Sequence, residues 1–512
     1  MGVNLLLHVS TKRVRVRLFF NKETIMKMKK VLFVFLYIVL GCLWPGETVA
    51  QEARYQVGVC DWMVLKRQKL GEFDLARQLG CDGVELDMGG LGQREAFDNQ
   101  LRDDAQAARF RHVADSLGVK VGAVAMSGFY AQDLTQKDTY LSLADDCFDT
   151  MDKMGGVRVA FLPLGGCGND WTTDKAKRKE IVRRLHEMGE RAQARGKVIG
   201  LDTPLDARGN LKLLKEIKSQ GIAIFYKFQN ALECGVDICK DMQQLGAKNI
   251  CAIHASNTDG RWLRNDSLID LPAIRRTLDK MGWSGWLFVE RSRDVSMVRN
   301  VKMNYGANVF TLREVFSTPV EATVKLNEEG RPADYVQTIL GRAEKATDEL
   351  SMTYTREGLD VRNIVANRYF QLNDIYAERD SLKKTDKRLA EAVADSKLYR
   401  SHFAFDADLL LRLRPDQVER VKDVMTFNVV KVTYEAQCDM IPTLKEEEKA
   451  QIMAWLKEAR ELAIDAESSK KKHEVFGKYK GRINNYLAKR GYDLTKEREE
   501  WYKRVKARGG QL

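Results

Sequence analysis

Between residues 55 and 316, short apolar runs alternate with longer amphipathic stretches. The stretch 177–195 is typical of the longer ones, because Ile181, Leu185, Met188 and Ala192 recur at the spacing of one helical face. The short runs are bounded by polar loops and have the length of strands. They predict strands at 56–61, 83–86, 120–126, 158–162, 198–202, 223–228, 250–254 and 286–290.

This alternation predicts an α/β fold. Strands that alternate strictly with helices form parallel sheets whose faces are both covered. Eight strand–helix units in about 260 residues fit a closed (β/α)₈ TIM barrel, which we place at 54–316. A doubly wound open sheet is the alternative. It is disfavoured because no glycine-rich phosphate fingerprint follows the first strand.

After residue 316 the alternation stops. Ser317-Thr318-Pro319, Gly330 and Pro332 predict a linker at 317–332, followed by a mainly α-helical domain at 333–512. Helices are expected at 333–352 and 361–382 and from Pro415 onward. Thr443 and Glu446 have the spacing of a capping box at the start of a further helix. Residues 427–432 form an isolated β-like run.

The first 50 residues predict an upstream segment and a signal peptide. Lys27, Lys29 and Lys30 precede an apolar run of 14 residues at 31–44, and small residues follow up to Ala50. The run is short for a bilayer, so we expect no transmembrane span in the mature chain. The expected localisation is exported, in the periplasm. The alternative is a lipid anchor at Cys42, within Val39-Leu40-Gly41-Cys42.

Charge and cysteine content narrow the possible partners. Residues 1–50 carry eight Lys/Arg and two Asp/Glu, so the net charge of +12 falls to +6 without them. Such a mild excess does not indicate a nucleic-acid partner. No CxxC pair occurs after the signal segment, which favours buried free thiols over a disulfide framework. A homo-oligomer is compatible with this composition.

Titratable side chains gather where the predicted strands end. In a barrel of this kind the chemistry takes place at the carboxyl ends of the strands, so these residues define a candidate active site. They include Glu85, Asp202, Lys227, His254 and Glu290. The first strand is followed by Trp62.

Three segments resemble the xylose-isomerase-like TIM-barrel superfamily, including its sugar phosphate isomerase/epimerase branch. They are Cys81-Asp82-Gly83-Val84-Glu85-Leu86, Ile253-His254 with the following Asn257, and Leu287-Phe288-Val289-Glu290. The second half is similar to a helical domain of unknown function found in exported bacterial proteins. Met440–Leu444 and the segment 476–484 carry that similarity.

The resemblance implies a divalent metal held by acidic residues that end strands five, six and eight and by a histidine that ends strand seven. Carried over, these become Asp202, a strand-six position, His254 and Glu290. Strand six ends in Lys227, whose ammonium opposes a cation. In one interpretation Gln229 or Asn230 completes a site for Mn, Mg or Zn; in the other, Lys227 replaces the metal, which is then absent.

The resemblance also implies a sugar isomerase/epimerase-like enzyme that transfers a proton next to a carbonyl. The expected catalytic residues are Asp202 and Glu290, with Glu85 or Lys227 as alternates. The resemblance implies a small-molecule carbohydrate as the partner, and export favours a non-phosphorylated sugar or sugar derivative. One alternative is a 3-keto-glycoside lyase or hydrolase in glycan breakdown, and another is a catalytically decayed barrel that only binds carbohydrate. The expected substrate-binding residues are Trp62, Asn257, Arg261, Trp262 and Arg264.

Overall fold

The computed structural model describes residues 3–9, 12–18, 54–65 and 67–509. The chain divides into two units, residues 1–53 and 54–512. In the first unit, β1 (Val3–Val9) pairs antiparallel with β2 (Lys12–Leu18). The predicted signal segment and Cys42 lie outside the described residues. Among the helices that are described, none combines the length and apolar character needed to cross a bilayer.

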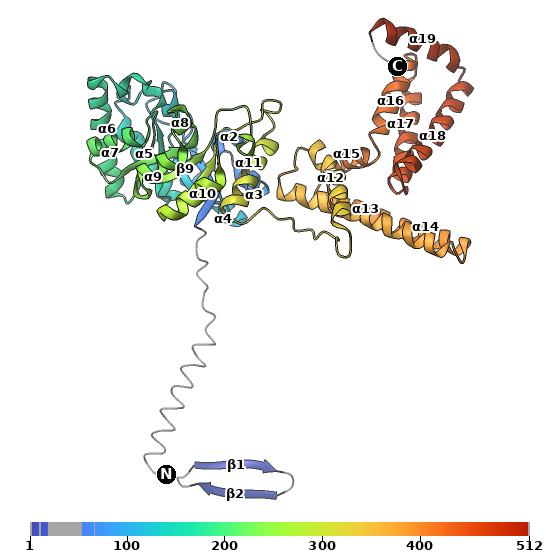
Figure 1. The fold of residues 1–512 in the computed structure, drawn as a ribbon, viewed down its shortest axis with the longest axis horizontal. Helices are drawn as coiled ribbons and strands as arrows, with labels where there is room; N and C mark the ends of the chain where they lie inside the picture. The colour runs from blue at the N-terminus through green and yellow to red at the C-terminus, as the bar shows by residue number, and fades with distance from the viewer. Residues whose placement is uncertain (1–2, 10–11, 19–53, 66, 510–512) are drawn as a thin grey trace. The chain divides into compact units, whose positions relative to one another are not determined.

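Within the described part of residues 54–512, eight parallel strands close into a barrel in chain order, β10 pairing with β3. Figure 1 shows helices around these strands. Every predicted strand lies within one residue of an observed one, so the barrel is confirmed and the open sheet is excluded. The strands are β3 (Tyr55–Cys60), β4 (Gly83–Asp87), β5 (Lys120–Ala125), β6 (Val159–Pro163), β7 (Val198–Asp202), β8 (Ile222–Lys227), β9 (Ile250–Ala255) and β10 (Gly285–Val289).

Helices follow the strands and cover the barrel. Many begin at an aspartate whose side chain accepts a backbone N–H of the first turn, as Asp174 and Asp206 do. They are α2 (Asp61–Val64), α3 (Gly71–Gln78), α4 (Asp104–Leu117), α5 (Tyr140–Lys153), α6 (Lys175–Ala194), α7 (Ala207–Ile217), α8 (Phe228–Glu233), α9 (Ile238–Leu245), α10 (Leu271–Met281) and α11 (Val301–Phe316).

The barrel interior is filled by side chains. Phe161, Phe225 and Phe288 are fully or almost fully buried and pack against small residues of neighbouring strands, Ala123, Ala125 and Ala252. A Cβ at Gly122 would lie 2.5 Å from the ring of Trp286, so glycine makes room for that aromatic side chain. The polar groups at the carboxyl ends of the strands therefore rest on an apolar layer.

The second half is helical, as predicted. Residues 427–432, expected to be β-like, instead form a left-handed turn at Phe427 and Asn428 and the start of a helix. The capping box also lies two residues later than expected, since the Lys445 N–H donates to Glu448. The helices are α12 (Ala333–Glu349), α13 (Arg356–Leu382), α14 (Lys387–Leu410), α15 (Pro415–Met425), α16 (Val429–Met440), α17 (Glu446–Ile464), α18 (Ser469–Lys489) and α19 (Leu494–Ala507).

Hydrogen bonds join the predicted linker, residues 317–332, to α13. Asp360 accepts the backbone N–H groups of Thr323 and Val324, and the Asn363 amide donates to the Val324 carbonyl at 2.8 Å. The eight cysteines of the described residues are free thiols, as predicted, but only four of them are buried: Cys60, Cys81, Cys147 and Cys167.

A buried lysine gives the helical region a pH-dependent stability. Lys472 donates to the carbonyls of Met425 and Ile464 at 3.1 and 3.2 Å, and burial lowers its pKa to about 8. Between about pH 8 and 10.5 the unfolded chain then binds more protons than the folded one, so the free energy of unfolding rises with pH. At roughly 1.4 kcal/mol per pKa unit, the rise is about 3 kcal/mol.

We expect Lys472→Met to remove this rise. The measurement is urea denaturation between pH 7.5 and 10.5, with the exposed neighbour variant Lys470→Met as the control. An equal pH slope in wild type and Lys472→Met would contradict the assignment.

Candidate active site

Two clusters of polar side chains lie side by side at the carboxyl ends of the barrel strands. One surrounds the Lys227 ammonium, and the other joins Cys60, Glu85 and His254. The Nδ1 atom of His254 lies 3.9 Å from Glu290 Oε2 and links the two. The clusters bring together the main carboxylates, the lysine and the histidine that the sequence placed at this rim.

The first cluster is built around Lys227, the last residue of β8. Its ammonium lies 2.7 Å from Glu290 Oε2 and 3.5 Å from Asp202 Oδ2. The Tyr130 hydroxyl lies 3.0 Å from Glu290 Oε1 and 3.3 Å from both Asp202 Oδ2 and the ammonium. Asn230, in the first turn of α8, donates to the other Asp202 oxygen and to the Thr203 carbonyl.

The charges in this cluster stabilise one another. Burial alone would lower the pKa of Lys227, but the charges of Asp202 and Glu290 outweigh it and raise the pKa above its ordinary value. Burial alone would raise the pKa of Glu290, yet Lys227 and His254 lower it to about 2. At neutral pH the site therefore holds an ammonium and the Glu290 carboxylate, with side chains 5% and 1% exposed.

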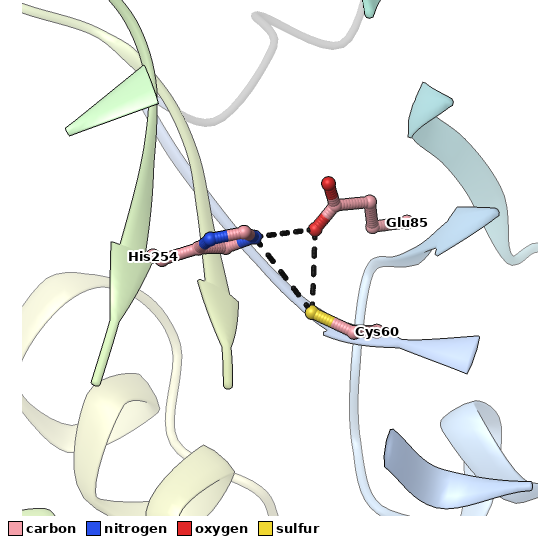
Figure 2. A group of neighbouring side chains, drawn as sticks. All are labelled: Cys60, Glu85 and His254. Carbon is pink, nitrogen blue, oxygen red and sulfur yellow. Dashed lines mark hydrogen bonds and ion pairs between the residues drawn. The ribbon is translucent and has the colours of Figure 1, made fainter. Parts of the chain in front are cut away.

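The second cluster is a triangle of three side chains from three strands (Figure 2). His254 Nε2 lies 2.6 Å from Glu85 Oε2, and the Cys60 thiol donates to the same oxygen at 3.2 Å. Burial alone would lower the pKa of His254, but the Glu85 charge and hydrogen bond raise it. Burial, and then the Glu85 charge, raise the pKa of Cys60, which keeps it a thiol at neutral pH.

Two residues of these clusters were not predicted from the sequence. Cys60 ends β3, and the sequence indicates only that it is one of the free thiols; Tyr130 lies in a 3₁₀ turn after β5. The pattern of hydrophobic and polar positions identifies neither of them as a site residue. The Nε2 atom of Gln229, a predicted metal ligand, donates to Glu233 within α8, and the neighbouring Asn230 is the amide that holds Asp202.

Trp62 is half-buried beside the clusters. Its ring stacks on Phe161 with centroids 6.3 Å apart and meets the His254 ring edge-on at 6.4 Å. Its indole nitrogen lacks a hydrogen-bond partner among the described residues. Of the predicted substrate-binding residues, Trp62 is therefore the one in direct contact with these clusters.

Hydrogen bonds and aromatic packing hold the loop that follows β9. The Asn257 amide donates to Asp266 at 2.9 Å, and the Trp262 indole donates to Asn304 at 2.9 Å. The Trp262 ring packs edge-on against Tyr354 of the helical half, with centroids 5.6 Å apart. Arg261 and Arg264 are exposed and form no ion pair with any described residue.

Trp262 is therefore expected to contribute to stability through Tyr354 and Asn304. We expect Trp262→Ala to lower the free energy of unfolding by about 2 kcal/mol, from the lost aromatic pair and hydrogen bond. Urea denaturation measures this loss, and a double-mutant cycle with Tyr354→Ala isolates the ring contact. A coupling energy near zero would contradict the contact.

Other carboxylates at the strand ends support loops. Asp61 accepts the backbone N–H groups of Gln68 and Asp87 at 2.9 and 3.1 Å. Asp87 pairs with Arg67 at 2.9 Å, and Asp206 caps α7. These acids hold the loops around the two clusters in place.

A divalent metal does not fit between Asp202 and Glu290. The Lys227 ammonium occupies the space that a cation bridging these carboxylates would need, and its raised pKa keeps it charged. The sequence left two interpretations open, a metal site completed by an amide oxygen and a lysine in place of the metal. The geometry between Asp202 and Glu290 favours the second. Among the described residues, two groups of three His, Cys, Asp or Glu side chains place their potential ligand atoms within 4.8 Å of one another. They are Cys60–Glu85–His254 and His402–Asp406–Glu461.

Comparisons with known proteins agree with this architecture. Residues 73–311 match the family described as xylose isomerase-like TIM barrel. Residues 336–507 match the family described as protein of unknown function (DUF3826). Two regions of the chain thus match the two families that the resemblances implied. No curated protein matches the chain.

Several solved structures are similar to the chain. One is D-psicose 3-epimerase in the presence of D-fructose, at 12% identity over 51% of this chain and 99% of that chain, with a TM-score of 0.43. Another is 3-keto-D-glucoside 4-epimerase from E. coli, at 14% identity over 51% and 98%, with a TM-score of 0.41. L-ribulose 3-epimerase matches at 18% identity over 47% and 82%, with a TM-score of 0.38.

Proposed function

We propose that the barrel is a sugar isomerase/epimerase-like enzyme that transfers a proton next to the carbonyl of a non-phosphorylated sugar. The observation that carries the proposal is the Lys227 ammonium, fixed between Asp202 and Glu290 at the carboxyl ends of the strands. Proton abstraction beside a carbonyl creates a negative oxygen, and a preorganised positive charge stabilises it.

Lys227 acts as a cation in this proposal. A lysine that attacks a carbonyl to form a Schiff base needs a neutral amine, whereas the raised pKa of Lys227 keeps it protonated. Its ammonium would contact the carbonyl oxygen of the sugar and the enediolate that follows. The Tyr130 hydroxyl, 3.3 Å from the ammonium, is a second donor for the same oxygen.

Asp202 is the carboxylate that we assign to proton transfer. Its side chain is 10% exposed against 1% for Glu290, so a sugar that enters from the rim meets Asp202 first. Glu290, with a pKa of about 2, is a weak base and a permanent anion. Glu290 therefore positions Lys227 and Tyr130, while Asp202 removes the proton and returns it.

The choice of a non-phosphorylated sugar rests on the proposed export of the chain. The basic and apolar residues at 27–44 support export to the periplasm, with a lipid anchor at Cys42 as the alternative. Sugar phosphates are largely confined to the cytoplasm. Free sugars and oxidised sugars are therefore the substrate classes that we propose for testing.

The test is hydrogen exchange at sugar carbons. The protein is incubated in D₂O with free aldoses, ketoses and 3-keto-glycosides, with and without chelator, and deuterium incorporation is followed by NMR. We expect exchange next to the carbonyl that persists with chelator. Aglycone release would instead support the lyase, and binding without exchange across the panel would support a barrel that only binds carbohydrate.

A further inference from the structure

Three atoms that commonly ligate metals converge beside the Lys227 cluster. Cys60 Sγ, Glu85 Oε2 and His254 Nε2 lie 2.6 to 3.8 Å from one another. Figure 2 shows the three side chains pointing toward a common centre from β3, β4 and β9. All three residues are fully buried. The proposed proton transfer does not use this triangle as an acid or base.

The spacing fits a tetrahedral cation. Zinc binds sulfur at about 2.3 Å and nitrogen or oxygen at about 2.0–2.1 Å, which places tetrahedral ligands about 3.3–3.6 Å apart. The sulfur already lies 3.2 Å from the Glu85 oxygen and 3.8 Å from the His254 nitrogen. The His254–Glu85 contact, at 2.6 Å, would need to open by less than about 1 Å.

Two further atoms of the same residues lack partners. Glu85 Oε1 and His254 Nδ1 are buried and have no hydrogen-bond partner among the described residues. A cation at the centre also attracts Glu85 Oε1, which shares the coordination position of Oε2 as the second atom of a bidentate carboxylate. Binding through Nε2 places the proton of His254 on Nδ1, which faces Glu290 Oε2 at 3.9 Å. Metal-bound histidines commonly donate their other N–H to such a carboxylate.

We infer that Cys60, Glu85 and His254 form a binding site for a thiophilic divalent cation, with Zn²⁺ as the ion whose chemistry fits the three ligands. Thiolate and imidazole select zinc over magnesium or calcium. Binding releases the Cys60 thiol proton to solvent, and any second proton on His254 with it. The thiolate and carboxylate then neutralise the two positive charges, as a fully buried site requires.

This site differs from the Asp202–Glu290 pair and can be tested without any measurement of activity. The full chain is stripped with chelator under reducing conditions and titrated with Co²⁺, a spectroscopic substitute for Zn²⁺. We expect one equivalent to produce a thiolate-to-cobalt charge-transfer band, which added Zn²⁺ abolishes. Cys60→Ser should lose the band. Cys251→Ser, on the same strand as His254, should keep it, because that sulfur contacts the Ile224 carbonyl instead.

The wild-type spectrum alone can overturn the inference if a variant fails to fold. Absence of the band in the folded wild type, or Co²⁺ binding without it, would overturn the site. Binding at His402, Asp406 and Glu461 would give the second of these results, since that group contains no sulfur. A band that persists in Cys60→Ser would overturn it equally.

Discussion

Lys227→Met is expected to lower the rate of deuterium exchange into a sugar substrate by about 10²–10³-fold, the usual loss when a preorganised charge is removed. Methionine keeps most of the length of the side chain but removes its positive charge. Asp202 and Glu290 would then face each other without a cation. Exchange is measured by NMR in D₂O, with Lys212→Met, an exposed lysine of α7, as the control.

The same substitution is expected to destabilise the barrel. A buried charge that loses its partner costs about 3–5 kcal/mol, and the side chains of Lys227 and Glu290 are 5% and 1% exposed. Adding Glu290→Gln removes the more deeply buried of the two unpaired charges, so the double variant should regain part of the lost stability in urea denaturation and remain inactive. Exchange at the wild-type rate in Lys227→Met would refute the role of the ammonium.

Lys227→Asp is expected to create a binding site for Mn²⁺ that the wild type lacks at this place. The substitution removes the ammonium and adds a carboxylate beside Asp202 and Glu290, and oxygen ligands suit this ion. Electron paramagnetic resonance should detect one bound Mn²⁺ per variant chain. Mn²⁺ favours oxygen over sulfur ligands, so the measurement is insensitive to the Cys60 site.

Lys227→Asp combined with Asp202→Asn is the matched control and should lose the bound ion. Tight Mn²⁺ binding by the wild type that Asp202→Asn abolishes would show that the ammonium does not exclude a metal. The site at Asp202 would then have to be reassigned.

The barrel could be predicted from the sequence because its strands are buried on both faces. Such strands are continuous apolar runs, and the residue that ends each run lies at the rim. Asp202, Lys227, His254 and Glu290 follow directly from this rule. The helical half has no comparable rule, and residues 427–432 show the consequence: an apolar run that is locally β-like starts a helix.

The finer geometry depends on features that spacing does not encode. Gln229 and Asn230 are neighbours in sequence, but α8 begins at Phe228 and successive side chains on a helix point in directions about 100° apart. Asn230 reaches Asp202 and Gln229 does not. Tyr130 lies in a loop whose path follows from tertiary packing. Trp262 contacts Tyr354, a residue distant in sequence, so no local pattern could reveal its partner.

The cation between Asp202 and Glu290 is encoded in the gene of this chain. An enzyme whose active-site cation is a bound metal ion depends on the supply of that metal and is inhibited by chelators. Lys227 is a covalent part of the polypeptide, so every molecule contains it and no other ion can replace it. The charge at this position is therefore independent of the metal content of the surroundings.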